Sequence, residues 1–201
     1  MTPTTSSASN YAHTTPERGR ALRPWWAWVI TFAAFPPAGY LGRVVAGRVD
    51  TAFAALLAGV TTGAVLGVGQ WLLLRRRGVS FRWAAATAVA LGVGLMAGAA
   101  VVSYDTGHLD LAVMGAVSGL AVGLAQAAAI GSRHASTLVW GATTAALWAL
   151  GWQLTSGVIE VADQWPIFGA SGALVVTFLQ STFIERVLPL GNRAAVTAAA
   201  S

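Results

Sequence analysis

The chain has 201 residues, of which 56% are hydrophobic and only 9% are charged, whereas about a quarter of the residues in an ordinary soluble domain are charged. This composition argues against a water-soluble fold, and the absence of cysteine and lysine excludes disulfides, thiol nucleophiles and Schiff-base chemistry. The net charge of +5 reflects twelve arginines and seven acids. Because these arginines cluster beside apolar blocks rather than in a separate basic domain, we expect no nucleic acid partner.

The chain begins with a polar segment, residues 1–22, rich in Ser, Thr and Pro and predicted to be a disordered cytoplasmic tail. An all-α transmembrane domain is predicted over residues 23–190, and residues 191–201 form a second disordered tail. The apolar blocks do not alternate as β-barrel strands do, and each is long enough for a helix to cross the hydrocarbon core. Six transmembrane helices are predicted, at 24–42, 53–74, 83–103, 111–131, 137–157 and 166–184.

The first predicted helix contains paired prolines, Pro36 and Pro37. Proline lacks an N–H, so the pair removes two helical hydrogen bonds and is expected to leave the carbonyls near positions 32 and 33 without partners. We expect a kink here. It either fits the helix around its neighbours or exposes carbonyls that could coordinate a cation.

An internal repeat relates the second, fourth and sixth helices. Each carries three small residues at intervals of four and then a glutamine: Gly59, Gly63, Gly67 and Gln70; Gly115, Gly119, Gly123 and Gln126; Gly169, Ala173, Thr177 and Gln180. The intervening helices begin with tryptophan, at Trp25 and Trp26, at Trp83 and at Trp140. The sequence therefore predicts three two-helix hairpins, at about 23–77, 78–134 and 135–190.

At 100° per residue the small residues and the glutamine share one helix face. Small residues let membrane helices approach closely, and a glutamine can hydrogen-bond across the contact, so one interpretation is helix packing. In the other, Gln70, Gln126 and Gln180 surround a pseudo-threefold axis as a polar ring that lines a narrow pore or binds a small ligand. The candidate site comprises these glutamines with Gly63, Gly67, Gly119 and Gly123.

The stretch GAVLGVGQWLLLRRR at 63–77, followed by FRW at 81–83, resembles a motif of uncharacterised bacterial multi-pass membrane proteins. In these proteins a Gly-rich helix ends in Gln-Trp-x-x-Leu-Arg and is repeated along the chain. The fourth and sixth helices depart from the motif, because Ala127 and Ser181 stand where the second has Trp71. The resemblance implies a bacterial membrane protein and no particular activity.

Catalytic and metal chemistry find little support. None of the predicted spans carries an ionisable residue near the bilayer midplane, which argues against proton relays, intramembrane proteases and a haem held by histidines. The nearest metal candidates, Asp105, His108, Asp110, Glu160 and Asp163, lie in outer loops and are expected to be solvated. Trp148 and Trp152 share one face of the fifth helix, where they flank an apolar ligand or form packed core; the other tryptophans are expected in the aromatic belts. No cofactor is predicted.

Orientation follows from the positive-inside rule. Ten arginines flank one side of the predicted spans, and only Arg43 and Arg48 lie on the other, together with five acids. We expect a multi-pass protein of the bacterial cytoplasmic membrane with both termini cytoplasmic, in contact with anionic headgroups and with a membrane-protein partner or a second copy. The favoured function is a non-enzymatic structural or interaction module. A small-solute channel or facilitator is the alternative, and a lipid-modifying enzyme is a third.

Overall fold

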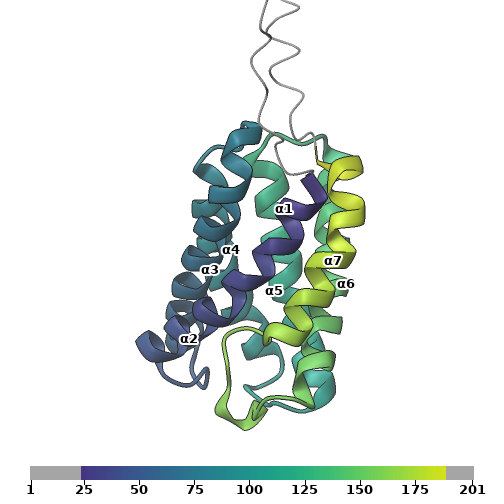
Figure 1. Cartoon of the computed structure of the whole chain (residues 1–201). Coiled ribbons are helices and arrows are strands. Elements are labelled where there is room, and N and C mark those ends of the chain that lie inside the picture. Colours follow the sequence, from purple (N-terminus) through teal and green to yellow (C-terminus); the bar gives the residue numbers. More distant parts are fainter. Residues whose placement is uncertain (1–23, 189–201) are drawn as a thin grey trace, which may run out of the picture.

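The computed structural model describes residues 24–188, and the prediction of an all-helical chain is confirmed for them, because they contain no strand (Figure 1). The predicted tails, 1–22 and 191–201, lie outside the described residues. The helices in chain order are α1 (Pro24–Ile30), the 3₁₀ turn η1 (Thr31–Ala34), α2 (Phe35–Ala46), α3 (Ala52–Leu74), η2 (Arg75–Arg77), α4 (Arg82–Val101), α5 (His108–Ala129), α6 (His134–Ser156), η3 (Val161–Asp163) and α7 (Ala170–Val187).

Each predicted span contains a helix, but not every helix has the length and composition of a membrane span. Four do so in the described part of the chain: Trp26–Ala46, Ala52–Arg77, Arg82–Val101 and His108–Ala129. Threonine, tryptophan and glutamine side chains lower the mean hydropathy of α6, and α7 has a shorter apolar segment, Ala170–Ile184. The α7 helix begins later than the predicted residue 166, because Pro166 belongs to the preceding loop. The structure therefore supports an all-α membrane protein, and six crossings remain a prediction.

The first helix is interrupted where the prolines predicted a kink. The 3₁₀ turn η1 separates α1 from α2, and Pro36 and Pro37 lie in the first turn of α2, where a missing N–H costs nothing. One expected detail is wrong: the Phe32 carbonyl is not left without a partner, because it accepts a hydrogen bond from the Phe35 N–H. The tighter 3₁₀ geometry places that donor one residue earlier than an α-helix would.

The helices form a closed bundle in which each packs against its neighbours in the sequence (Figure 1). The most extensive contacts join α3 to α4 and α5 to α6, and α7 packs along α1 to complete the circuit. By contrast, α2 packs on α3 and barely touches α7. The α1–α2 segment therefore bends away from α7 after the 3₁₀ turn.

Both ends of the described chain lie at the same end of the bundle. There α1 begins and α7 ends, beside the turns 75–81 and 130–133 (Figure 1). Gly78 and Gly131 have φ values of 80° and 67° in these turns, a conformation that glycine adopts without strain. This end carries Arg75, Arg76, Arg77, Arg82 and Arg133. The opposite end, formed by the connections 47–51, 102–107 and 157–169, carries most of the acids.

Candidate functional site

The glycines of α3 bring its backbone against α4. A Cβ atom added to Gly63 would lie 2.7 Å from the Thr87 carbonyl oxygen, and one added to Gly67 would lie 2.9 Å from the Ala84 carbonyl oxygen. Real Cβ atoms do not approach backbone atoms so closely, so any larger residue would push the helices apart. Gly63 and Gly67 therefore lie at a helix–helix contact.

The α5 stripe makes the same kind of contact with α6. A Cβ atom at Gly119 would lie 2.8 Å from the Thr144 carbonyl oxygen, and one at Gly123 would lie 2.8 Å from the Cα of Gly141. In α7, where larger residues replace two of the glycines, the Thr177 hydroxyl instead lies 3.4 Å from the Val29 carbonyl oxygen of α1. The α3 and α5 stripes thus each face the tryptophan-bearing helix that follows in the chain. In α7, Thr177 faces α1, whereas a Cβ atom at Gly169 would lie 3.1 Å from the Thr155 side chain of α6. The α3 and α5 stripes therefore lie between the predicted hairpins and not within them.

The three glutamines lie in one buried layer, and each accepts a hydrogen bond from a tryptophan. The Nε1–H of Trp83 donates to Oε1 of Gln70 at 2.9 Å, and that of Trp140 donates to Oε1 of Gln126 at 3.4 Å. The third pair joins the two ends of the domain, because Trp28 Nε1 donates to Gln180 Oε1 at 3.3 Å. The hydrogen bonds therefore follow the same cyclic order as the small-residue contacts.

The amide nitrogens extend this layer. Nε2 of Gln126 donates to Oε1 of Gln70 and to the Thr87 hydroxyl, both at 3.0 Å. Nε2 of Gln180 donates to the Thr144 hydroxyl at 3.1 Å. All of these side chains are at most 3% exposed, and a buried amide that lacked partners would carry a large desolvation cost. Gln126, with three such bonds, is the most highly connected member.

The tryptophan rings close the layer toward the arginine-rich end. Trp28, Trp83 and Trp140 are at most 1% exposed, and the ring of Trp28 meets those of Trp83 and Trp140 edge to face, with centroids 6.0 and 5.6 Å apart. They pack with apolar side chains, including Leu74 and Ile184. We call the three glutamines, Trp28, Trp83, Trp140, Thr87 and Thr144 the Gln–Trp layer. Indole rings occupy the space between the helices here.

The role of the tryptophans is where the sequence reasoning was wrong. It placed Trp28, Trp83 and Trp140 in an interfacial belt and matched the first repeat through Trp25 and Trp26, but Trp26 is 48% exposed whereas Trp28 is buried. One signal was available. A threonine follows each of the three tryptophans of the layer by three or four residues, at Thr31, Thr87 and Thr144, and none stands at that distance from Trp26.

The other candidates are not assembled into sites. Among the side chains that the structure describes, no three His, Asp or Glu groups are placed together to bind a metal ion, so the candidates of the outer loops are not brought together. His108 instead lies with its Nδ1 3.1 Å from the Ser156 hydroxyl. Trp148 and Trp152 form packed core, where both meet the ring of Phe168 edge to face.

Comparisons with known proteins add no identification, because no family model, curated protein or solved structure matches the chain. The resemblance in residues 63–83 therefore remains a prediction.

Proposed function

We propose that the chain is a non-enzymatic membrane protein that crosses the bilayer six times as three hairpins and serves as a structural or interaction module. The surface of the bundle supports the membrane setting. Many large apolar side chains point outward along the helices, among them Val44, Phe53, Val89, Val93, Val113, Leu120, Leu138 and Phe178, each at least 40% exposed. Water would oppose this arrangement, whereas lipid tails favour it.

The charges at the two ends support an orientation. The turns 75–81 and 130–133 carry arginines and no acid, and the opposite connections carry Asp50, Asp105, Glu160 and Asp163. The positive-inside rule then places the arginine-rich end, together with both termini, in the cytoplasm. The arginines there would also contact anionic headgroups.

The observation that carries the proposal is the hydrogen bonding of the three glutamines to one another and to other buried side chains of the Gln–Trp layer. A pore lined by amides needs amide groups directed at the permeating solute. Here the Oε1 atom of every glutamine accepts from a buried indole, and Gln126 uses both N–H groups of its amide on other side chains. This geometry favours a device that holds the hairpins together over a solute pathway.

The hydroxyl groups of the helices give no comparable support to an enzymatic function. The hydroxyls of Thr87, Ser118 and Thr177 donate to carbonyls one turn earlier in their own helices, which is the usual arrangement for such residues in membrane helices. The hydroxyls of Ser181 and Thr182 in α7 likewise donate to backbone carbonyls one turn earlier. We therefore place the function in contacts with lipids and with another membrane protein or a second copy.

Solute flux tests the proposal directly. The purified chain is reconstituted into vesicles, and shrinkage after an osmotic jump is followed with glycerol, urea and chloride as probes. We expect no flux above that of protein-free vesicles. Flux that the triple change Gln70→Leu, Gln126→Leu and Gln180→Leu abolishes, and that Gln153→Leu on the exposed face of α6 leaves intact, would establish the channel alternative instead.

Orientation can be tested separately because the chain contains no cysteine. Single cysteines at exposed positions, Ser80→Cys at one end and Asp50→Cys and Ala162→Cys at the other, are treated in intact cells with a maleimide that cannot cross the membrane. We expect the last two to react and Ser80→Cys to react only after lysis. The reverse pattern would contradict the cytoplasmic assignment of the termini.

A further inference from the structure

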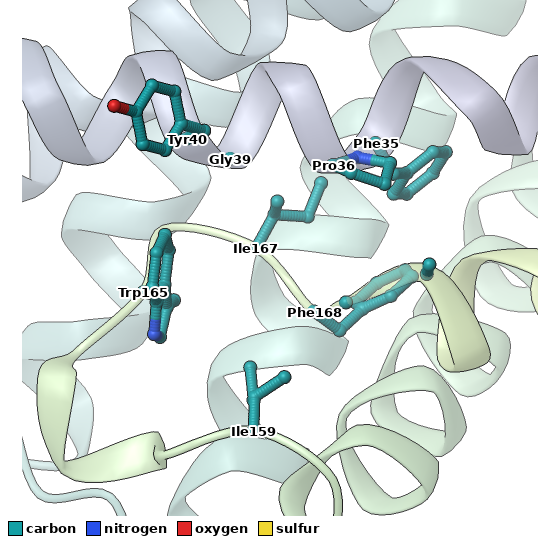
Figure 2. A pocket seen from close by; sticks show the side chains of 10 residues that line it. Phe35, Pro36, Gly39, Tyr40, Ile159, Trp165, Ile167 and Phe168 are labelled. Carbon is teal, nitrogen blue, oxygen red and sulfur yellow. The ribbon is translucent and has the colours of Figure 1, made fainter.

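A cavity of about 250 Å³ lies between α2 and the loop that leads into α7. Figure 2 shows α2, with Phe35 and Tyr40, along one side and the loop residues Trp165, Ile167 and Phe168 along the other. Its walls are almost entirely apolar, and the only polar side-chain atoms among its lining residues belong to Tyr40 and Trp165. We call this space the α2–α7 cleft.

The interruption of the first helix creates the cleft. While α1 packs along α7, α2 bends toward α3 after the 3₁₀ turn, so a gap opens beside the N-terminus of α7. Its floor is well packed, because the tilted rings of Phe35 and Phe168 lie with centroids 5.2 Å apart and Phe35 meets Trp148 edge to face. The gap is therefore a preformed feature of the packed core.

The mouth of the cleft opens on the lipid-facing surface. Tyr40 is 62% exposed, and Leu41 and Val44, next to it on α2, are also exposed and apolar. Pro36 and Ala170 line the cleft and reach the surface as well. A ligand that enters here comes from the bilayer, and apart from Tyr40 and Trp165 the side chains that line the cleft offer it no hydrogen bonds. Those are the requirements of a hydrocarbon chain.

A cation lies on the cleft-lining face of α2, in the last turn of the helix. Arg43 lies on the same helix face as Pro36, Gly39 and Tyr40, since these positions are spaced by three and four residues. It is partly buried near the end of α2, and its guanidinium makes no hydrogen bond or ion pair with any residue of the described part of the chain. Arginine binds phosphate groups through paired N–H donors.

We propose that the α2–α7 cleft binds one acyl chain of a bilayer phospholipid while Arg43 contacts the phosphate of the same lipid. This inference rests on the membrane placement proposed above. The leaflet involved is the one opposite the arginine-rich end. The lipid would then fill the gap that the 3₁₀ turn leaves between α2 and α7 and tie these two segments together.

Photolabelling tests the site. The full chain is reconstituted in phosphatidylglycerol vesicles containing a phosphatidylglycerol with a diazirine near the end of one acyl chain, and adducts are mapped by mass spectrometry after irradiation. We expect residues 36–40 and 165–170 to be labelled well above the exposed, lipid-facing Val89 and Val113. Equal labelling of the cleft and of these two valines would overturn the proposal. A chain unlabelled even at Val89 and Val113 would contradict the membrane placement itself.

Two variants with matched controls sharpen the test. Ala170→Phe places a ring in the cleft from the exposed first residue of α7, and Ala52→Phe makes the same change at the exposed first residue of α3. We expect Ala170→Phe to reduce cleft labelling about tenfold, the equivalent of about 1.4 kcal/mol, and Ala52→Phe to leave it unchanged. Undiminished labelling in Ala170→Phe would overturn the site.

The headgroup contact has its own readout. Arg43→Gln should lower cleft labelling about fivefold, since an arginine near an anionic surface contributes about 1 kcal/mol. Arg82→Gln, at the opposite end, should have no effect on it. If the cleft is labelled equally in Arg43→Gln and in Arg82→Gln, Arg43 does not hold the phosphate, and that part of the proposal is wrong.

Discussion

The two ends of the bundle use glutamine in opposite ways. In the Gln–Trp layer, Gln126 is 2% exposed and bonds to three buried side chains. At the other end Gln164, partly exposed in the loop before α7, accepts from Arg48 Nε at 3.1 Å and donates to the Tyr104 carbonyl at 3.0 Å. The chemistry is the same, but water can replace the second set of partners and not the first.

This difference shows where the fold is specified. A buried amide has no alternative to its partners, so the Gln–Trp layer fixes which helix follows which around the bundle. At the opposite end, by contrast, water can replace the partners of a polar side chain, so the packing is less strictly specified. There the first helix bends away from α7, a cavity remains between them, and Gln164 adopts a φ of 52° that few side chains favour.

The largest expected effect comes from separating α5 and α6 beside the Gln–Trp layer, where a Cβ atom added to Gly119 would meet the carbonyl oxygen of Thr144. Gly119→Leu should lower the free energy of unfolding by about 3 kcal/mol, because its side chain meets the backbone of α6 and the helices have to move apart. Unfolding in sodium dodecyl sulfate, followed by circular dichroism, measures it. Gly157→Ala is the control, since nothing lies within 4 Å of its added Cβ. Equal stability of the two variants would refute the close contact of α5 and α6.

The second effect comes from the most highly connected glutamine. Gln126→Leu removes three hydrogen bonds, and at about 0.6 kcal/mol each in membrane proteins the expected loss is about 2 kcal/mol. The same unfolding assay applies. Gln153→Leu, an exposed change in α6, serves as the control and should cost less than half as much. A loss for Gln126→Leu no greater than that of Gln153→Leu would show that the layer does not stabilise the fold.

A tryptophan pair tests which residue begins the first repeat. Trp28→Phe removes the donor to Gln180 and leaves a small void, with an expected loss of about 1 kcal/mol. Trp26→Phe changes a residue that is 48% exposed and should have a smaller effect. A larger loss in Trp26→Phe would restore the assignment made from the sequence alone and contradict the place of Trp28 in the layer.

Much of the architecture could be predicted from the sequence, because apolar blocks and glycine intervals act locally. The positions of the helices and the break at Pro36 required only hydropathy and the missing proline N–H. The shared face of Gly119, Gly123 and Gln126 followed from helical periodicity in the same way. Such features depend on residues within one helix.

The partners of these faces could not be predicted, because they depend on the order of packing. Periodicity places Gln180 on a face of α7, but it does not say that α7 closes on α1 and meets Trp28, 152 positions earlier in the chain. The choice between Trp26 and Trp28 depends likewise on which face of α1 packs against α7. The α2–α7 cleft arises from the interruption of the first helix at the 3₁₀ turn and has no signature in composition.

The smallest expected effect is that of Gln164→Leu, the change at the opposite end of the bundle that corresponds to Gln126→Leu. Gln164→Leu removes the same type of side chain and two hydrogen bonds, but Arg48 and the Tyr104 carbonyl can then turn to water or headgroups, so we expect a loss of about 0.5 kcal/mol. The ratio of the two losses, measured in one detergent by the same unfolding assay, is the informative quantity. Gln126→Leu should cost several times more than Gln164→Leu. If the outer change costs as much as the inner one, solvent does not compensate for the lost partners, and the loop before α7 is as important for the fold as the Gln–Trp layer.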